Sequence, residues 1–384
     1  SDDNIVFSHT SILEFYLAEY ARSNEEFLNF MIQKGNRIYF KNEICFYSGL
    51  VPDCKKLLDS MADTIIETIL NNIEIIDTLN NIEIITDFKI EKDELIKKLE
   101  ENRPTQKEID DMSNSSQKEV TPDEFSKKKS PVLLEIKQNS QDSENIEEEI
   151  AQQEAENFYV LVSIYGSILK NAELLDNSDK VQHLENYMYA MNILLGEIFA
   201  LAEVIKKEIP FEDFIKEKQE EGKELTQEDF EKSKELFLEM IKVSFPIALQ
   251  HVILENVGTP KLEVAIDELM GQKEDKPFEK FMLEFLKCDL NVGNVMSELH
   301  RYIQKETSEG ILKLIFMKLL FYYRMRFFGT NTQIYNSILD LIIEVQIKLN
   351  PEKSSTLSKA FKGNRSIVRK EFAKQIEKNQ SIEL

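Results

Sequence analysis

The sequence is poor in the residues that make turns. Its 384 residues include 11 Gly and 9 Pro. Sheet-rich folds need frequent tight turns, and Gly and Pro are prominent among the residues that make them. Hydrophobic residues still reach 42%, so a sizeable core can form. Together with abundant Ile, Leu, Glu and Lys, this composition predicts an all-α fold built from long helices.

Basic residues are outnumbered. Lys and Arg number 47 against 70 Asp and Glu, and the formal net charge is −23. Nucleic-acid binders usually present a basic face, because the release of counterions from phosphates drives their affinity. We therefore expect no nucleic acid to bind the chain as a whole. An acidic chain of this kind favours a protein partner that carries basic residues.

Cysteine and histidine are scarce. Cys45, Cys54 and Cys288 form no C-x-x-C pair, which predicts free thiols in a reducing cytoplasm. None of the four His residues belongs to an H-x-x-x-H or E-x-x-H pattern. The nearest candidate for a metal half-site is His251 with Glu255, one helical turn away, and a surface hydrogen bond is the simpler interpretation. We expect no metal and no other cofactor.

Motifs for phosphate binding and nucleophilic catalysis are also missing. The sequence contains no G-x-x-x-x-G-K-[ST], no G-x-G-x-x-G and no G-x-S-x-G, and its glycines are scattered singly. Backbone amides rarely converge on a phosphate without several glycines close together. We therefore expect no enzymatic activity. The alternative is an enzyme, or a secreted effector, with an all-α active site that no known motif reveals.

No segment of the sequence predicts a membrane span. The most apolar run, at 311–328, is interrupted by Lys313, Lys318, Arg324 and Arg326, whereas a spanning helix needs about 20 residues with few or no charges. The sequence shows no signal peptide, so we expect a cytoplasmic protein. The chain begins at Ser1 rather than at Met, which leaves open whether a signal or an anchor precedes it.

The clearest helical periodicity lies at 155–206, where apolar residues recur every three or four positions on either side of a polar turn at 176–179. A similar pair is predicted at 311–328 and 334–349. Two long helices joined by a short turn lie antiparallel, as in helix bundles. We therefore predict a bundle-like main helical domain at 155–350.

Signals for the start and the end of helices divide the segment between these two predicted helix pairs. Thr226 with Asp229 predicts a capped helix start, because each side chain can satisfy a backbone amide of the other. Pro246 predicts a break, since proline removes a helical hydrogen bond. In the run at 311–328, the preferred interpretation is a core helix whose cations, Lys318 among them, reach the rim and pair with Glu.

The N-terminal region, 1–101, is predicted to be helical with one exception. Helices are expected at 12–21 and 24–34. The segment 37–47 is rich in aromatic and β-branched residues that alternate around a polar centre, which predicts a short β-hairpin.

A polar, acidic linker is predicted at 102–154. Between 102 and 149, nine of 48 residues are apolar, and this is too few to offset the entropy lost on ordering. The linker contains one apolar island, which predicts either a docking motif for a partner or a segment that packs on the protein's own surface: Val132, Leu133, Leu134 and Ile136.

The C-terminal tail, 351–384, is predicted to be a basic amphipathic helix. It carries eight basic residues against four acidic ones in a chain that is otherwise acidic. Six of these basic residues are candidates for contact with a partner: Lys359, Lys362, Arg365, Arg369, Lys370 and Lys374. The tail is the one segment from which we expect binding to nucleic acid or to an anionic membrane.

Long amphipathic helices, a linker and a tail of opposite charge favour a non-enzymatic scaffold or adaptor. Such a protein binds other proteins through its helical faces and its charged segments. The sequence identifies no particular partner, and it leaves open whether the chain forms a homo-oligomer.

Overall fold

The structure is a computed structural model that consists of helices and the turns between them, with no strand among the residues it describes. The all-α prediction is confirmed. The described residues are 10–72, 74, 79, 158–208, 226–290, 295–325, 332–350, 369 and 373. The predicted linker at 102–154 and most of the predicted tail at 351–384 lie outside them.

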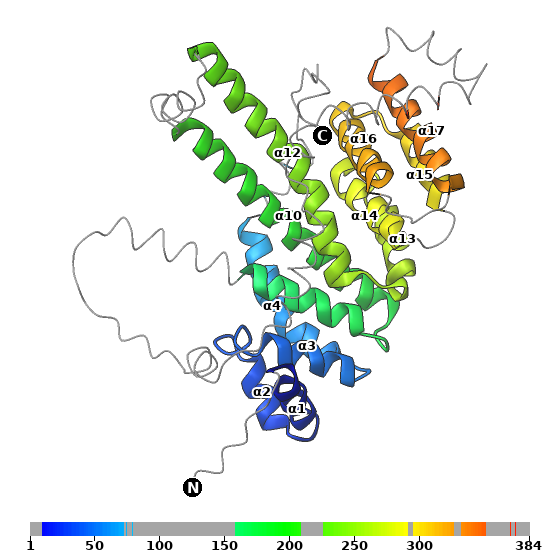
Figure 1. Ribbon diagram of the computed structural model, residues 1–384. Coiled ribbons are helices and arrows are strands. Elements are labelled where there is room, and N and C mark those ends of the chain that lie inside the picture. Colours follow the sequence, from blue (N-terminus) through cyan, green and yellow to red (C-terminus); the bar gives the residue numbers. More distant parts are fainter. Residues whose placement is uncertain are drawn as a thin grey trace, which may run out of the picture. The chain divides into compact units, whose positions relative to one another are not determined.

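The described residues form two compact units. Unit 1 holds those up to Asn71 together with 158–190, and unit 2 holds Asn72, Glu74, Leu79 and those from Met191 onward. The division falls inside the long helix α10 (Asn177–Glu208), which Figure 1 shows in green.

In unit 1, α1 packs against α2 and α3, and α4 contributes a buried face to the core. The helix buries one stripe of residues three or four positions apart, from Leu57 and Leu58 through Met61 and Ile65 to Ile69. The unit consists of α1 (Thr10–Ser23), α2 (Glu25–Ile32), α3 (Lys41–Leu50), α4 (Lys55–Asn71), a helix at 158–171 and the first part of α10. The helices predicted at 12–21 and 24–34 are confirmed as α1 and α2.

The hairpin predicted at 37–47 is wrong. Residues 37–40 form turns, and residues from Lys41 onward form α3. Ile44 and Ser48, four residues apart, are buried on one side of α3, which packs against α1. The Asn171 amide of the helix at 158–171 donates a hydrogen bond of 2.9 Å to the Ser48 hydroxyl. Packing against these helices outweighs the β-propensity of the aromatic residues.

Unit 2 is built on α12 (Gln227–Val257), which packs against α14 and α16 (Figure 1). The predicted cap is present, because the Thr226 hydroxyl accepts from the Asp229 amide and the Asp229 carboxylate accepts from the Thr226 amide. Pro246, however, does not break α12. It is buried within a helix that continues for eleven further residues, to Val257.

The remaining helices of unit 2 follow in short steps. They are η1 (Pro260–Leu262), α13 (Glu263–Gln272), α14 (Pro277–Asp289), α15 (Val295–Lys305), α16 (Glu309–Arg324) and α17 (Thr332–Leu349). The helices α16 and α17 pack against each other, as the sequence predicts. The rings of Phe278, Phe281, Phe285 and Tyr322 form a row in the core, with centroids 5.0–6.2 Å apart.

One lysine joins α17 to the end of α15. The Lys348 ammonium donates hydrogen bonds of 2.7, 2.7 and 2.8 Å to the backbone carbonyls of Ile303, Gln304 and Glu306. The last carbonyls of a helix have no partner within the helix. Lys348 therefore caps α15 from another helix.

Two helices, α10 and α12, are long and apolar enough, by length and composition, to cross a membrane. Core helices of proteins without any membrane span pass the same test, so this is weak evidence. The apolar positions of α10 include Leu184, Tyr187 and Met191, all fully buried.

Candidate functional sites

Unit 1 exposes aromatic side chains along α1, α2 and α3. Tyr16 and Tyr20 lie one helical turn apart on α1, and Phe15 directly precedes Tyr16. Their rings continue onto neighbouring elements, because Phe15 lies 6.2 Å from Phe46 and Tyr20 lies 5.3 Å from Phe27, measured between centroids. We call the exposed set the aromatic surface, and its members are 38–64% exposed: Phe15, Tyr16, Tyr20, Phe30, Tyr39 and Phe46.

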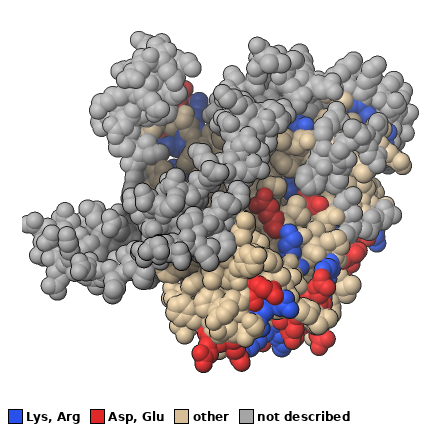
Figure 2. All heavy atoms as spheres, turned by 60° about the horizontal axis from the view of Figure 1, so that its bottom comes forward, with Lys and Arg blue, Asp and Glu red and all other residues tan. Residues whose placement is uncertain are grey.

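The surroundings of these helices are mixed in charge. Figure 2 brings forward the end of the structure where α1–α3 lie, and it shows a broad area without charged residues beside a strip of alternating acidic and basic residues. Proteins rarely expose large apolar patches without a use for them. The aromatic surface is therefore a candidate contact surface.

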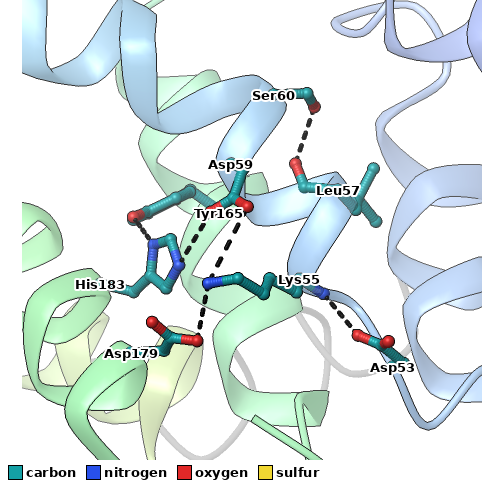
Figure 3. Close-up of polar contacts among 8 residues, drawn as sticks. All are labelled: Asp53, Lys55, Leu57, Asp59, Ser60, Tyr165, Asp179 and His183. Carbon is teal, nitrogen blue, oxygen red and sulfur yellow. Dashed lines mark hydrogen bonds and ion pairs between the residues drawn. The ribbon is translucent and has the colours of Figure 1, made fainter. Parts of the chain in front are cut away.

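A second cluster of unit 1 is centred on His183, whose side chain is 6% exposed. Its Nδ1 lies 2.6 Å from the Tyr165 hydroxyl, and its Nε2 lies 3.4 Å from Oδ1 of Asp59 on α4 (Figure 3). Nearby, the Lys55 ammonium contacts Asp179 at 2.6 Å. Burial lowers the pKa of His183 and raises the pKa of Tyr165.

Asp59, His183 and Tyr165 follow one another as carboxylate, imidazole and hydroxyl, as in an acid–base relay. The hydroxyl, however, is not accessible from solvent. Tyr165 is fully buried, so no substrate can reach its oxygen. The cluster instead connects α4, the helix at 158–171 and α10 by polar contacts inside unit 1 (Figure 3). Its role is to hold these helices together.

Unit 2 buries an ion pair between α14 and α16. The Lys318 ammonium lies 3.0 Å from the Asp289 carboxylate, and the two side chains are 2% and 1% exposed. The Tyr322 hydroxyl donates to the same carboxylate. Burial lowers the pKa of Lys318 and raises the pKa of Asp289, Tyr322 and Cys288. The expectation that Lys318 reaches the rim is wrong, because its charge is neutralised inside the core.

Unit 2 also contains a pocket of about 770 Å³ lined mainly by α13, α14 and α15. Inside it, the Lys287 ammonium contacts Asp267 at 2.6 Å and Glu298 at 2.9 Å. Glu284 lines the same pocket, and burial raises its pKa to about 7. We call this site the charged pocket. A cleft that holds a titratable group with a shifted pKa is a candidate binding site.

Most of the partner-contact residues predicted from the sequence lie outside the described residues: Val132, Leu133, Leu134, Ile136, Lys359, Lys362, Arg365, Lys370 and Lys374. Arg369 is described, and its guanidinium pairs with the Asp340 carboxylate of α17. The structure thus gives Arg369 a contact within the chain, and its contact with a partner stays a prediction.

Sequence reasoning missed both candidate sites. The alternation at 37–47 favoured a hairpin, although Tyr16 and Tyr20, one helical turn apart, already place two rings on the same side of a helix. The sequence contains no such signal for the charged pocket, because the residues that line it come from separate helices. His251 and Glu255 form an exposed helix-surface pair, with 3.5 Å between Nε2 and Oε1.

Among the described residues, no group of three or more His, Cys, Asp or Glu side chains is placed to hold a metal ion. Comparison of the chain with protein-family models, with curated proteins and with solved structures finds no match.

Proposed function

We propose that the chain is a non-enzymatic helical scaffold that binds another protein through the aromatic surface of α1–α3. The observation that supports this proposal is the exposure of six aromatic side chains, five of them on α1–α3 and Tyr39 in the turn before α3, in a unit that fully buries Met31, Ile44 and Leu58. Leaving apolar area in water costs about 25 cal/mol per Å². A partner that covers the surface recovers that free energy.

The chemistry of the surface favours a protein over other partners. Tyrosine combines a large apolar ring with a polar hydroxyl, and it is enriched among the residues that contribute most to protein–protein binding. The net charge of −23 repels nucleic acids and anionic membranes. The same charge speeds association with a basic protein, so we propose a partner with a basic rim around an apolar contact.

The test is site-specific photocrosslinking in cells that express the full chain. A benzophenone amino acid replaces Tyr16 in one variant and Leu174 in the matched control. Leu174 is 67% exposed in the same unit, outside α1–α3. We expect one protein to be captured at position 16 and not at position 174.

The captured protein is then purified, and its affinity for the chain is measured by calorimetry. Tyr20→Ala should weaken binding by about 2 kcal/mol, roughly 30-fold, whereas Leu174→Ala should leave it unchanged. Equal capture at both positions, or equal affinity of both alanine variants, would refute the proposal.

A further inference from the structure

The two sides of α12 differ in burial. One side packs against α14 and α16, and it buries a row of residues that includes Leu238, Leu249 and Ile253. The other side exposes 40% of Phe237 and 39% of Phe245. In the most apolar 18 residues of α12, 28% are buried. Because proteins rarely leave a row of apolar residues in water without a use for it, the outer side of α12 is a candidate contact with another chain.

The outer side of α12 is a mostly apolar stripe with a charge at each end. Lys234 precedes the stripe by three residues and Glu255 follows it by three. The charged residues between these ends, Glu235, Glu239 and Lys242, belong to other sides of the helix. We call this set the α12 stripe, and its members recur every three or four residues and are all at least partly exposed: Phe237, Ile241, Ser244, Phe245, Ala248 and Val252.

The α12 stripe matches its own reverse. Let two copies of α12 lie antiparallel, related by a two-fold axis that passes between residues 244 and 245. Each residue is then level with the residue equally far from that axis on the second copy. Phe237 faces Val252 of the second copy, and Ile241 faces Ala248. A large side chain thus meets a smaller one at each of these levels, which is the arrangement that lets two helices pack closely.

The charges at the two ends of the stripe match as well. In the same arrangement Lys234 faces Glu255 of the second copy, whereas a parallel arrangement would bring like charges together. The Lys234 ammonium also contacts Phe230 and Glu231, one turn away on α12. Glu255 contacts His251 of the same helix. Contacts of this local kind contribute about 0.2–0.5 kcal/mol each, so both charges can still pair with a second copy.

We propose that the chain forms a homodimer in which two copies of the α12 stripe pack antiparallel. From Lys234 to Glu255 the contact is about 32 Å long, at 1.5 Å per residue. One pair of helices buries less area than a typical stable interface, so we expect a dissociation constant in the micromolar range. The net charge of −23 opposes association of two copies, and salt screens this repulsion. The dimer should therefore form at physiological ionic strength and weaken several-fold when salt is removed.

The experiment is analytical ultracentrifugation of the full chain at physiological ionic strength, from about 1 to about 200 µM. We expect a monomer–dimer equilibrium. Ala248→Glu places a charge against Ile241 of the second copy and should raise the dissociation constant at least tenfold. Ala248 is exposed, so the variant should keep its helical circular dichroism. The matched control is Val264→Glu, which adds the same charge at a 67% exposed position on α13 and should change nothing.

Exchange of the end charges tests the antiparallel order. Lys234→Glu and Glu255→Lys should each weaken the dimer several-fold, because like charges then face each other. Mixed in equal amounts, the two variants should associate with each other more tightly than either does with itself, since every facing pair is again of opposite charge. The double variant Lys234→Glu with Glu255→Lys should recover the dissociation constant of the wild type.

A chain that stays monomeric over the whole concentration range overturns the proposal, and the α12 stripe would then serve another protein or a membrane surface. A dimer that Ala248→Glu leaves intact also overturns it, as does a mixture of the two charge variants without preference for each other. Tyr20→Ala on the aromatic surface should leave the dimer unchanged. A dimer lost in Tyr20→Ala and kept in Ala248→Glu would assign self-association to the aromatic surface instead.

Discussion

The His183 cluster of unit 1 and the Lys318–Asp289 pair of unit 2 bury titratable groups in opposite ways. Unit 1 buries the neutral ring of His183 and keeps its acid, Asp59, at the surface, where the carboxylate is 53% exposed. Unit 2 buries both members of the Lys318–Asp289 pair, and it also holds Glu284 in the charged pocket. A buried neutral group needs only a hydrogen bond, whereas a buried charge needs an opposite charge. Of the two clusters, the Lys318–Asp289 pair should therefore be the more sensitive to loss of one member.

The largest effect should come from breaking the pair in unit 2. Lys318→Met leaves the Asp289 carboxylate without its counter-charge, and it should lower the free energy of unfolding by about 3–5 kcal/mol. The double variant Lys318→Met with Asp289→Leu should recover most of that loss, because no charge stays buried. Urea titrations followed by circular dichroism measure both variants. If the double variant is as unstable as the single one, the hydrogen bond from Tyr322 contributes more than charge compensation does.

The next largest effect is the pH dependence contributed by Glu284. Its pKa is raised from 4.5 to about 7, so the folded state holds a proton that the unfolded state releases. Its contribution to stability is complete below pH 4.5 and is lost as the pH rises through 7, by about 3 kcal/mol at most. Glu284→Gln should therefore be more stable than the wild type at pH 8 and equal to it at pH 4, in thermal denaturation.

His183 should give the opposite sign. Burial lowers its pKa, so its contribution to stability is present above the unfolded pKa of about 6.5 and is lost as the pH falls through the folded pKa. His183→Phe also leaves the Tyr165 hydroxyl without its partner, which costs about 1–3 kcal/mol at pH 8. At acidic pH the difference between the variant and the wild type should shrink. A constant difference from pH 8 to pH 5 would show that His183 does not take up a proton in this range.

The smallest loss of stability should come from removing an exposed polar contact, the cap of α12. Thr226→Ala removes the capping box of α12 and should cost about 1 kcal/mol. Hydrogen exchange should accelerate in the first turn of α12 and stay unchanged around Pro246. A loss of unfolding free energy as large as that of Lys318→Met would show that an exposed cap stabilises the fold as much as the buried pair does.

The helices were largely predictable from the sequence, because apolar periodicity and the Thr226 cap are local signals. The two errors came from the packing of distant residues. Pro246 stays inside α12, and the segment that includes Ile44 becomes helical because it packs against α1. The residues next to Pro246 and Ile44 in the sequence give no sign of these contacts.

The candidate sites were less predictable. The exposure of Tyr16 and Tyr20 depends on which side of α1 the rest of unit 1 covers, and periodicity alone does not reveal it. The contact between Lys318 and Asp289 joins residues 29 positions apart on two helices. The same holds for Lys287 and Asp267, 20 positions apart, so the charged pocket can be recognised only once the helices are assembled.

Lys348 connects α17 to a wall of the charged pocket. Its ammonium holds the last carbonyls of α15, and α15 carries Tyr302 in the wall of that pocket. Fraying of α17 would release this end of α15 and so loosen that wall. The C-terminal helix is in this way tied to the wall of the charged pocket, through Lys348 and through the contact of 3.1 Å between His300 on α15 and Glu344 on α17.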